Sequence, residues 1–93
     1  MAKINSFAYQ REVLEQFLAL LTGFERDFKS LIGNFDQEVT SLYEEKGLME
    51  EIYDDYKATY LTSLNATLAD IQTRIHEEDI PFIEKEIDFM SSH

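Results

Sequence analysis

The sequence predicts an all-α protein, a long two-helix hairpin followed by a short third helix at the C-terminal end. Apolar residues recur every three or four positions over most of the chain, which is the spacing of one face of a helix. Three glycines and one proline in 93 residues leave little to punctuate a sheet. No Asn-Gly or Asp-Gly pair separates alternating apolar runs, so β-hairpins are not expected.

The first helix is expected over residues 6–45. Between Leu14 and Leu42, eight steps along the apolar positions cover 28 residues, an average of 3.5 per step. That value is the heptad period of a left-handed helical bundle. The positions that form this first half of the predicted seam are Leu14, Phe17, Leu21, Phe24, Phe28, Leu31, Phe35 and Val39.

A turn is expected at residues 46–48, because Gly47 follows the last periodic residues and glycine is favoured just after a helix. The second helix is expected over residues 49–77, with about 3.7 residues per apolar step, so it should be straighter than the first. Its half of the seam consists of Ile52, Tyr56, Tyr60, Leu64, Leu68, Ile71 and Ile75.

Pro81 predicts a break or a kink, because proline is tolerated in the first turn of a helix but not in its interior. A short third helix is therefore expected over residues 80–90, with Asp79 as its N-cap. Residues 1–93 together are expected to form a single helical domain.

The net charge of −11 is concentrated in residues 33–93, where fifteen carboxylates face four basic side chains. Direct binding to nucleic acid or to an anionic membrane is disfavoured, since both depend on clustered Lys and Arg. A basic protein partner is compatible with this charge. The candidate partner surface lies beside the turn and consists of Glu44, Glu45, Glu50, Glu51, Tyr53, Asp54 and Asp55.

No catalytic, cofactor-binding or metal-binding residues are predicted. The pairs Glu50/Asp54 and Glu51/Asp55 lie one helical turn apart, but like charges at that spacing are common on solvated helix faces. The Asp-rich loop of a calcium site is missing. His76 has Thr73 three residues before it, so the Glu-x-x-His motif of di-iron helices is also missing.

Size favours self-association. A domain of this length buries only roughly 60% of its unfolded surface, and without cysteine it has no disulfide to add stability. Beside the seam, the first helix also carries Val13, Leu18, Leu20 and Ile32, which makes its apolar stripe wider than one neighbouring helix can cover. We therefore expect a homodimer in which two hairpins form an antiparallel four-helix bundle.

The chain lacks a run near the ~18 apolar residues of a membrane span, and its first residues lack the pattern of a cleavable signal. The expected location is the cytoplasm, with export without a cleaved signal as the alternative.

A length near one hundred residues, a turn at Gly47 near the middle, the lack of cysteine and the acidic balance resemble a known family. This family comprises the small helical-hairpin proteins of type VII secretion, the early-secretory-antigen or Trp-x-Gly proteins. The chain departs from its signature: it has no tryptophan, and Phe82-x-x-x-Glu86 is the nearest substitute for the Tyr-x-x-x-Asp/Glu export signal. The resemblance implies a dimeric hairpin that is exported or acts as an adaptor for a larger effector.

The predicted function is thus a non-enzymatic protein–protein interaction module of the secretion-associated type. Two alternatives stay open. One is a cytosolic adaptor, chaperone or immunity-type inhibitor of the same architecture. The other is an acidic inhibitor whose carboxylates imitate the phosphates of a nucleic acid.

Overall fold

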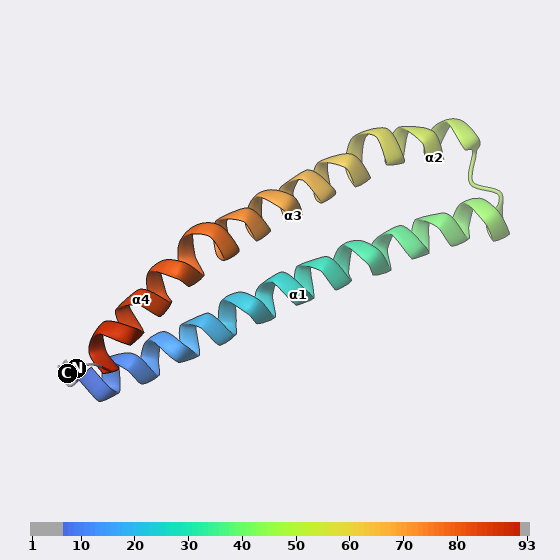
Figure 1. The fold of residues 1–93 in the computed structure, drawn as a ribbon. Coiled ribbons are helices and arrows are strands. Elements are labelled where there is room, and N and C mark those ends of the chain that lie inside the picture. Colours follow the sequence, from blue (N-terminus) through green and yellow to red (C-terminus); the bar gives the residue numbers. More distant parts are fainter. Residues whose placement is uncertain (1–6, 92–93) are drawn as a thin grey trace, which may run out of the picture. The chain divides into compact units, whose positions relative to one another are not determined.

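The computed structural model describes residues 7–91, and all of these except residues 47–49 are helical (Figure 1). The all-α class and the helical hairpin are therefore confirmed. In chain order the elements are α1 (Phe7–Lys46), α2 (Glu50–Tyr56), the π-helical turn η1 (Lys57–Leu61), α3 (Thr62–Arg74), the π-helical turn η2 (Ile75–Asp79) and α4 (Ile80–Ser91). Residue 6, the expected start of the first helix, lies outside the described residues.

By its internal contacts the chain divides into two units. Unit 2 comprises Glu25–Ile71, so it contains the second half of α1, the turn, α2, η1 and most of α3. It is a hairpin whose arms run in opposite directions from the turn (Figure 1). Unit 1 contains residues 7–24 of α1 together with residues 72–91, which include η2 and α4.

The turn depends on Gly47, whose φ of 82° lies in the left-handed region that residues with a Cβ avoid. The backbone N–H of Leu48 donates to the carbonyl oxygen of Leu42 at 3.0 Å, which satisfies one of the free carbonyls at the end of α1. The carbonyl oxygen of Met49 accepts from the N–H groups of Ile52 and Tyr53, and these bonds start the second arm. Both arms therefore meet the turn within one residue of the expected positions.

The second arm is not the regular α-helix that its average spacing predicts, because η1 interrupts it. In η1 the N–H and the hydroxyl of Thr62 both donate to the carbonyl oxygen of Lys57, the hydroxyl at 2.8 Å. A π turn contains one residue more than an α-helical turn, so the position that faces the other arm moves from Tyr60 to Leu61. Tyr60 is 61% exposed, whereas Leu61 is half-buried. The inward residues of unit 2 on this arm are Tyr53, Tyr56, Leu61, Leu64, Leu68 and Ile71.

At Pro81 the chain stays helical, and no loop separates a second helix from a third. The π turn η2 precedes the proline, and the N–H of Ile80 donates to the carbonyl oxygen of Ile75, five residues back. This wider turn accommodates Pro81, which has no backbone N–H to donate to the hydrogen bonds of the helix. Asp79 is therefore not the N-cap that the sequence predicts. It lies inside η2, and its Oδ1 lies 3.8 Å from Nε of Arg74.

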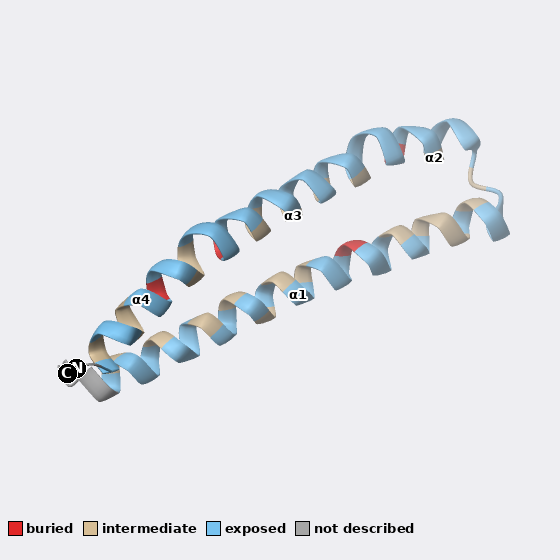
Figure 2. Ribbon diagram, in the orientation of Figure 1, coloured by how far each residue is buried: buried red, intermediate tan, exposed pale blue. Residues whose placement is uncertain are grey.

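Among residues 9–91, few side chains are deeply buried. Ile32 and Tyr56 form the buried core of unit 2, and Ile75 and Ile83 form that of unit 1. Figure 2 shows these residues as isolated buried segments on ribbons that are otherwise half-buried or exposed. A core this thin leaves much of the apolar surface of the helices in contact with solvent.

Candidate protein–protein interaction surface

The α1 helix carries two parallel apolar stripes. The inner stripe is turned toward the other helical arm, and its members are half-buried or buried. With about 100° of rotation per residue, they fall within an arc of about 80° around the helix axis. The members are Leu14, Leu18 and Leu21 in unit 1 and Phe28, Ile32, Val39 and Tyr43 in unit 2.

The outer stripe lies roughly 80° further around the same helix by the same rotation per residue. Its seven side chains are all large and apolar, are between 39% and 71% exposed, and fall within an arc of about 60°. The members are Val13, Phe17, Leu20 and Phe24 in unit 1 and Leu31, Phe35 and Leu42 in unit 2.

The seam predicted for α1 is thus divided between the two stripes. Leu14, Leu21, Phe28 and Val39 belong to the inner stripe. The other four members, Phe17, Phe24, Leu31 and Phe35, belong to the outer stripe and stay exposed in a single chain. On the other arm, Tyr56, Leu64, Leu68, Ile71 and Ile75 are half-buried or buried, and Ile52 and Tyr60 are exposed.

In unit 2 the two stripes border an apolar hollow of about 210 Å³. Four of its lining residues come from α1 at positions i, i+3, i+4 and i+7, and one comes from α3. All five lining side chains are apolar. The lining residues are Phe28, Leu31, Ile32, Phe35 and Leu64.

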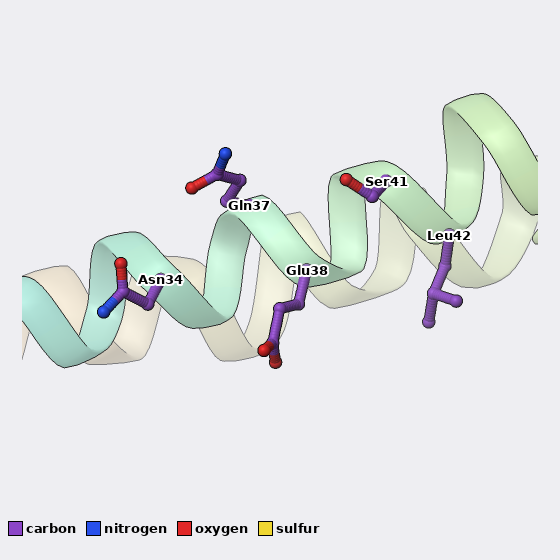
Figure 3. Close-up of a pocket in the computed structure, with 5 residues that line it drawn as sticks. All are labelled: Asn34, Gln37, Glu38, Ser41 and Leu42. Carbon is purple, nitrogen blue, oxygen red and sulfur yellow. The ribbon is translucent and has the colours of Figure 1, made fainter.

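A second depression on unit 2 lies over α1 alone and is open to solvent (Figure 3). It is lined by Asn34, Gln37, Glu38, Ser41 and Leu42. Figure 3 shows that these side chains leave the helix in different directions, so they do not converge on a ligand. Glu38 and Leu42 point to the same side of α1, which places the carboxylate of Glu38 beside the outer stripe.

Aromatic side chains hold the turn end of unit 2 together. The rings of Tyr43 and Tyr53 are stacked with centroids 4.2 Å apart, and Oγ1 of Thr40 lies 3.0 Å from the hydroxyl oxygen of Tyr53. Nζ of Lys57 lies 5.0 Å from the centroid of the Tyr53 ring. Tyr53, predicted as part of a partner surface, is half-buried and makes its contacts within the hairpin.

Carboxylates surround this aromatic cluster. Those predicted for the partner surface are exposed on both sides of the turn: Glu44, Glu45, Glu50, Glu51, Asp54 and Asp55. The negative charge of Glu50, with smaller contributions from burial and from Asp54, raises the pKa of Tyr43. Glu50 and Asp54 lie on α2 and Tyr43 lies on α1, so carboxylates of one arm act on a side chain of the other across the turn.

Sites for chemistry are not apparent in the part of the chain that the structure describes. Among residues 7–91, no three His, Asp or Glu side chains are grouped so that they could hold a metal ion. His76 is exposed on η2. None of the helices in this range is long and apolar enough to cross a membrane.

Comparison with known proteins adds no family assignment. The chain has no significant match to a protein-family model, to a curated protein or to a solved structure. Arguments about its function therefore depend on its own surface.

Proposed function

We propose that this protein is a non-enzymatic interaction module that binds a helical partner along the outer stripe of α1. The observation that carries the proposal is the alignment of seven exposed large apolar side chains within an arc of about 60° on one helix. Single exposed apolar residues are ordinary on protein surfaces, but a row of them at heptad spacing is typical of a helix–helix interface.

The size of the stripe supports a specific interface. The seven side chains are on average about half exposed. At ~150 to 250 Å² for an aromatic side chain, and less for Val and Leu, they leave on the order of 500 Å² uncovered. Stable interfaces bury about 800 Å² on each partner, whereas the largest apolar patch on a typical monomer is about 300 to 600 Å². The stripe therefore supplies a large part of the area that each partner of a stable interface buries.

The partner that we propose first is a second copy of the chain, so that two hairpins pair as an antiparallel four-helix bundle. Identical chains most often associate around a two-fold axis, which uses the same patch on both copies. A hairpin already supplies two of the four helices, and pairing along α1 covers the stripe that the second arm leaves open.

Two neighbouring residues allow folding and association to be separated. Leu31 is 63% exposed on the outer stripe, and Ile32 is 6% exposed in the core of unit 2. We expect the unchanged chain to sediment as a dimer at micromolar concentration. Leu31→Asp should sediment as a monomer that keeps its helical circular dichroism, and Ile32→Asp should lose that signal because it buries a charge. A chain that is monomeric at this concentration, or a dimeric Leu31→Asp variant, would contradict the proposal.

The second candidate function is binding of a basic protein at the acidic turn, as an adaptor or as an inhibitor that imitates nucleic acid. It is supported by the exposed carboxylates on both arms and by their effect on the pKa of Tyr43. Salt distinguishes the two functions, since exposed charges are screened beyond about 8 Å at physiological ionic strength. Binding of a basic partner should weaken as salt rises, whereas association of two chains of charge −11 should strengthen.

We further propose a secretion-associated role for this module, which the resemblance to type VII hairpin proteins suggests. Its support is the helical hairpin of this chain, and an analogy of fold does not by itself imply function. Detection of the intact chain in the culture medium of its own cells, with a cytosolic protein as the lysis control, tests this role. Retention of the chain inside the cells would favour the cytosolic adaptor or inhibitor.

A further inference from the structure

The apolar hollow of unit 2 has the geometry of a hole in a coiled-coil interface. In such an interface each projecting side chain inserts between four residues of the facing helix. Phe28, Leu31, Ile32 and Phe35 have the i, i+3, i+4, i+7 spacing of such a set, and they line the hollow together with Leu64 of α3. With no polar lining, the hollow suits an aliphatic or aromatic side chain.

We propose that Leu31 of a second copy fills this hollow, with the two α1 helices crossing antiparallel at a two-fold axis beside Leu31. The inference rests on the proposed self-association and adds its register and direction. Leu31 is well suited to this position because it is 63% exposed and borders the hollow itself. Each Leu31 would then serve both as the inserted side chain and as part of the hole for its counterpart.

The spacing along α1 supports this centre. From residue 17 to residue 45, the heptad positions that continue the outer stripe are 17, 20, 24, 27, 31, 35, 38, 42 and 45, with steps of 3, 4, 3, 4, 4, 3, 4 and 3. We call these nine positions the outer face: six belong to the outer stripe, and the other three are Asp27, Glu38 and Glu45. The order of steps is the same in both directions from residue 31. Two antiparallel copies centred on Leu31 therefore bring every position of the face opposite another position of the face.

Charge favours the antiparallel direction. Asp27 and Glu38 lie at two positions of this face, and both side chains are exposed. In a parallel pair each carboxylate would lie opposite its own copy, and like charges placed opposite one another are destabilising. In the antiparallel pair Asp27 lies opposite Phe35, and Glu38 lies opposite Phe24. A carboxylate can then lie against the positive edge of an aromatic ring.

The available area fits one second copy. Two outer stripes together offer on the order of 1,000 Å², since an aromatic side chain contributes ~150 to 250 Å² when fully exposed and Val or Leu contributes less. Specific stable interfaces bury about 1,200 to 2,000 Å² in total. The apolar area of two copies is therefore close to what a stable dimer needs.

The chain contains no cysteine, so single cysteines can report the geometry directly. Leu20 and Leu42 each lie eleven residues from Leu31 on α1. In the antiparallel pair the two copies of Leu42 lie about 33 Å apart at 1.5 Å per residue, whereas Leu42 of one copy lies opposite Leu20 of the other. A disulfide requires Cα atoms within about 7 Å.

We would oxidise Leu31→Cys, Leu20→Cys and Leu42→Cys separately, and an equimolar mixture of the last two after subunit exchange. Circular dichroism and sedimentation would first show that each variant is folded and dimeric. We expect Leu31→Cys and the mixture to form a covalent dimer. Leu20→Cys or Leu42→Cys alone should form about tenfold less covalent dimer, because the two identical cysteines are too far apart for a disulfide.

Three outcomes overturn the inference in distinguishable ways. Self-linkage of Leu42→Cys with little linkage in the mixture would show a parallel pair, and self-association would still stand. A dimer by sedimentation without linkage at any of these positions would show that another surface pairs. An unchanged chain that is monomeric by sedimentation would contradict the proposed self-association itself.

Discussion

The hydroxyl of Tyr56 donates a hydrogen bond of 2.9 Å to Oδ1 of Asp36, and this bond links the two arms of unit 2. Tyr56 is 6% exposed, and its ring also meets Phe35 edge to face at a centroid distance of 5.7 Å. Burial, together with the bond to Asp36, raises the pKa of Tyr56 to about 12. One buried tyrosine thus combines aromatic packing with the polar contact that fixes how the arms align.

Tyr56→Phe keeps the ring and removes this bond. We expect the free energy of unfolding to fall by about 1.5 to 2 kcal/mol, the lower part of the range for a hydrogen bond to a charged group, because half-buried Asp36 can regain water. Urea unfolding at fixed protein concentration measures the change. Tyr60→Phe is the matched control, since Tyr60 is exposed and should change stability by less than about 0.5 kcal/mol. Equal losses in the two variants would contradict this role of Tyr56.

The same pair gives a pH dependence. The folded pKa of Tyr56, about 12, lies above the value of about 10 expected for an unfolded tyrosine, so above pH 10 the folded chain binds more protons than the unfolded chain. Its contribution to stability is therefore complete below pH 10 and is lost as pH rises toward 12. Urea unfolding between pH 8 and about 11.5 should show the stability difference between the unchanged chain and Tyr56→Phe shrinking. A difference that stays constant would contradict the assignment.

The sequence predicted the helical class and the turn because both depend on local signals. Gly47 marks the end of α1, and the heptad spacing from Leu14 to Leu42 marks its apolar face. The contact between Asp36 and Tyr56 was not predictable in this way, because the two residues are twenty positions apart and meet only once the register of the hairpin is set.

The division of the α1 seam into two stripes could have been found by placing each residue at 100° intervals around the helix. Counting steps of three and four joins Leu14 and Phe17 in one seam, although the first is half-buried and the second is exposed. The π turns were harder to predict. An average of 3.7 residues per step on the second arm conceals one step of five, from Tyr56 to Leu61, among steps of three and four.

Substitution by alanine should change stability in opposite directions at Gly47 and at Gly33. Gly47→Ala should cost about 1 to 2 kcal/mol of stability, because alanine is strained at a φ of 82°. Gly33→Ala should add about 0.5 to 1 kcal/mol, since Gly33 lies inside α1 and an added Cβ would meet nothing within 4 Å. Urea unfolding of both variants at one protein concentration measures the two changes. Destabilisation by Gly33→Ala would indicate that another chain approaches α1 closely at that position.

Because of the π turn η1, deletion of one alanine should leave stability almost unchanged, whereas deletion of another should lower it. Deleting Ala58, which is exposed inside η1, shortens the step from Tyr56 to Leu61 from five residues to four. Regular α-helical geometry can then replace the π turn, and every later apolar residue keeps its direction. We expect the variant lacking Ala58 to retain its helical content and to unfold within about 1 kcal/mol of the unchanged chain.

Deletion of Ala66, an exposed alanine inside α3, is the matched control. It rotates Leu68 and Ile71 by about 100° away from the inner stripe of α1. If η1 instead became a regular α-helix to compensate for the deletion, Leu68 and Ile71 would keep their direction, but Leu61 and Leu64 would rotate by about 100°. In neither case do all four of these side chains face α1. Because these side chains are half-buried, exposing two of them costs about 1.5 to 3 kcal/mol, a large share of the stability of a small domain. Thermal and urea unfolding followed by circular dichroism compare the two deletions. Equal damage by both would show that η1 is not what keeps the second arm in register.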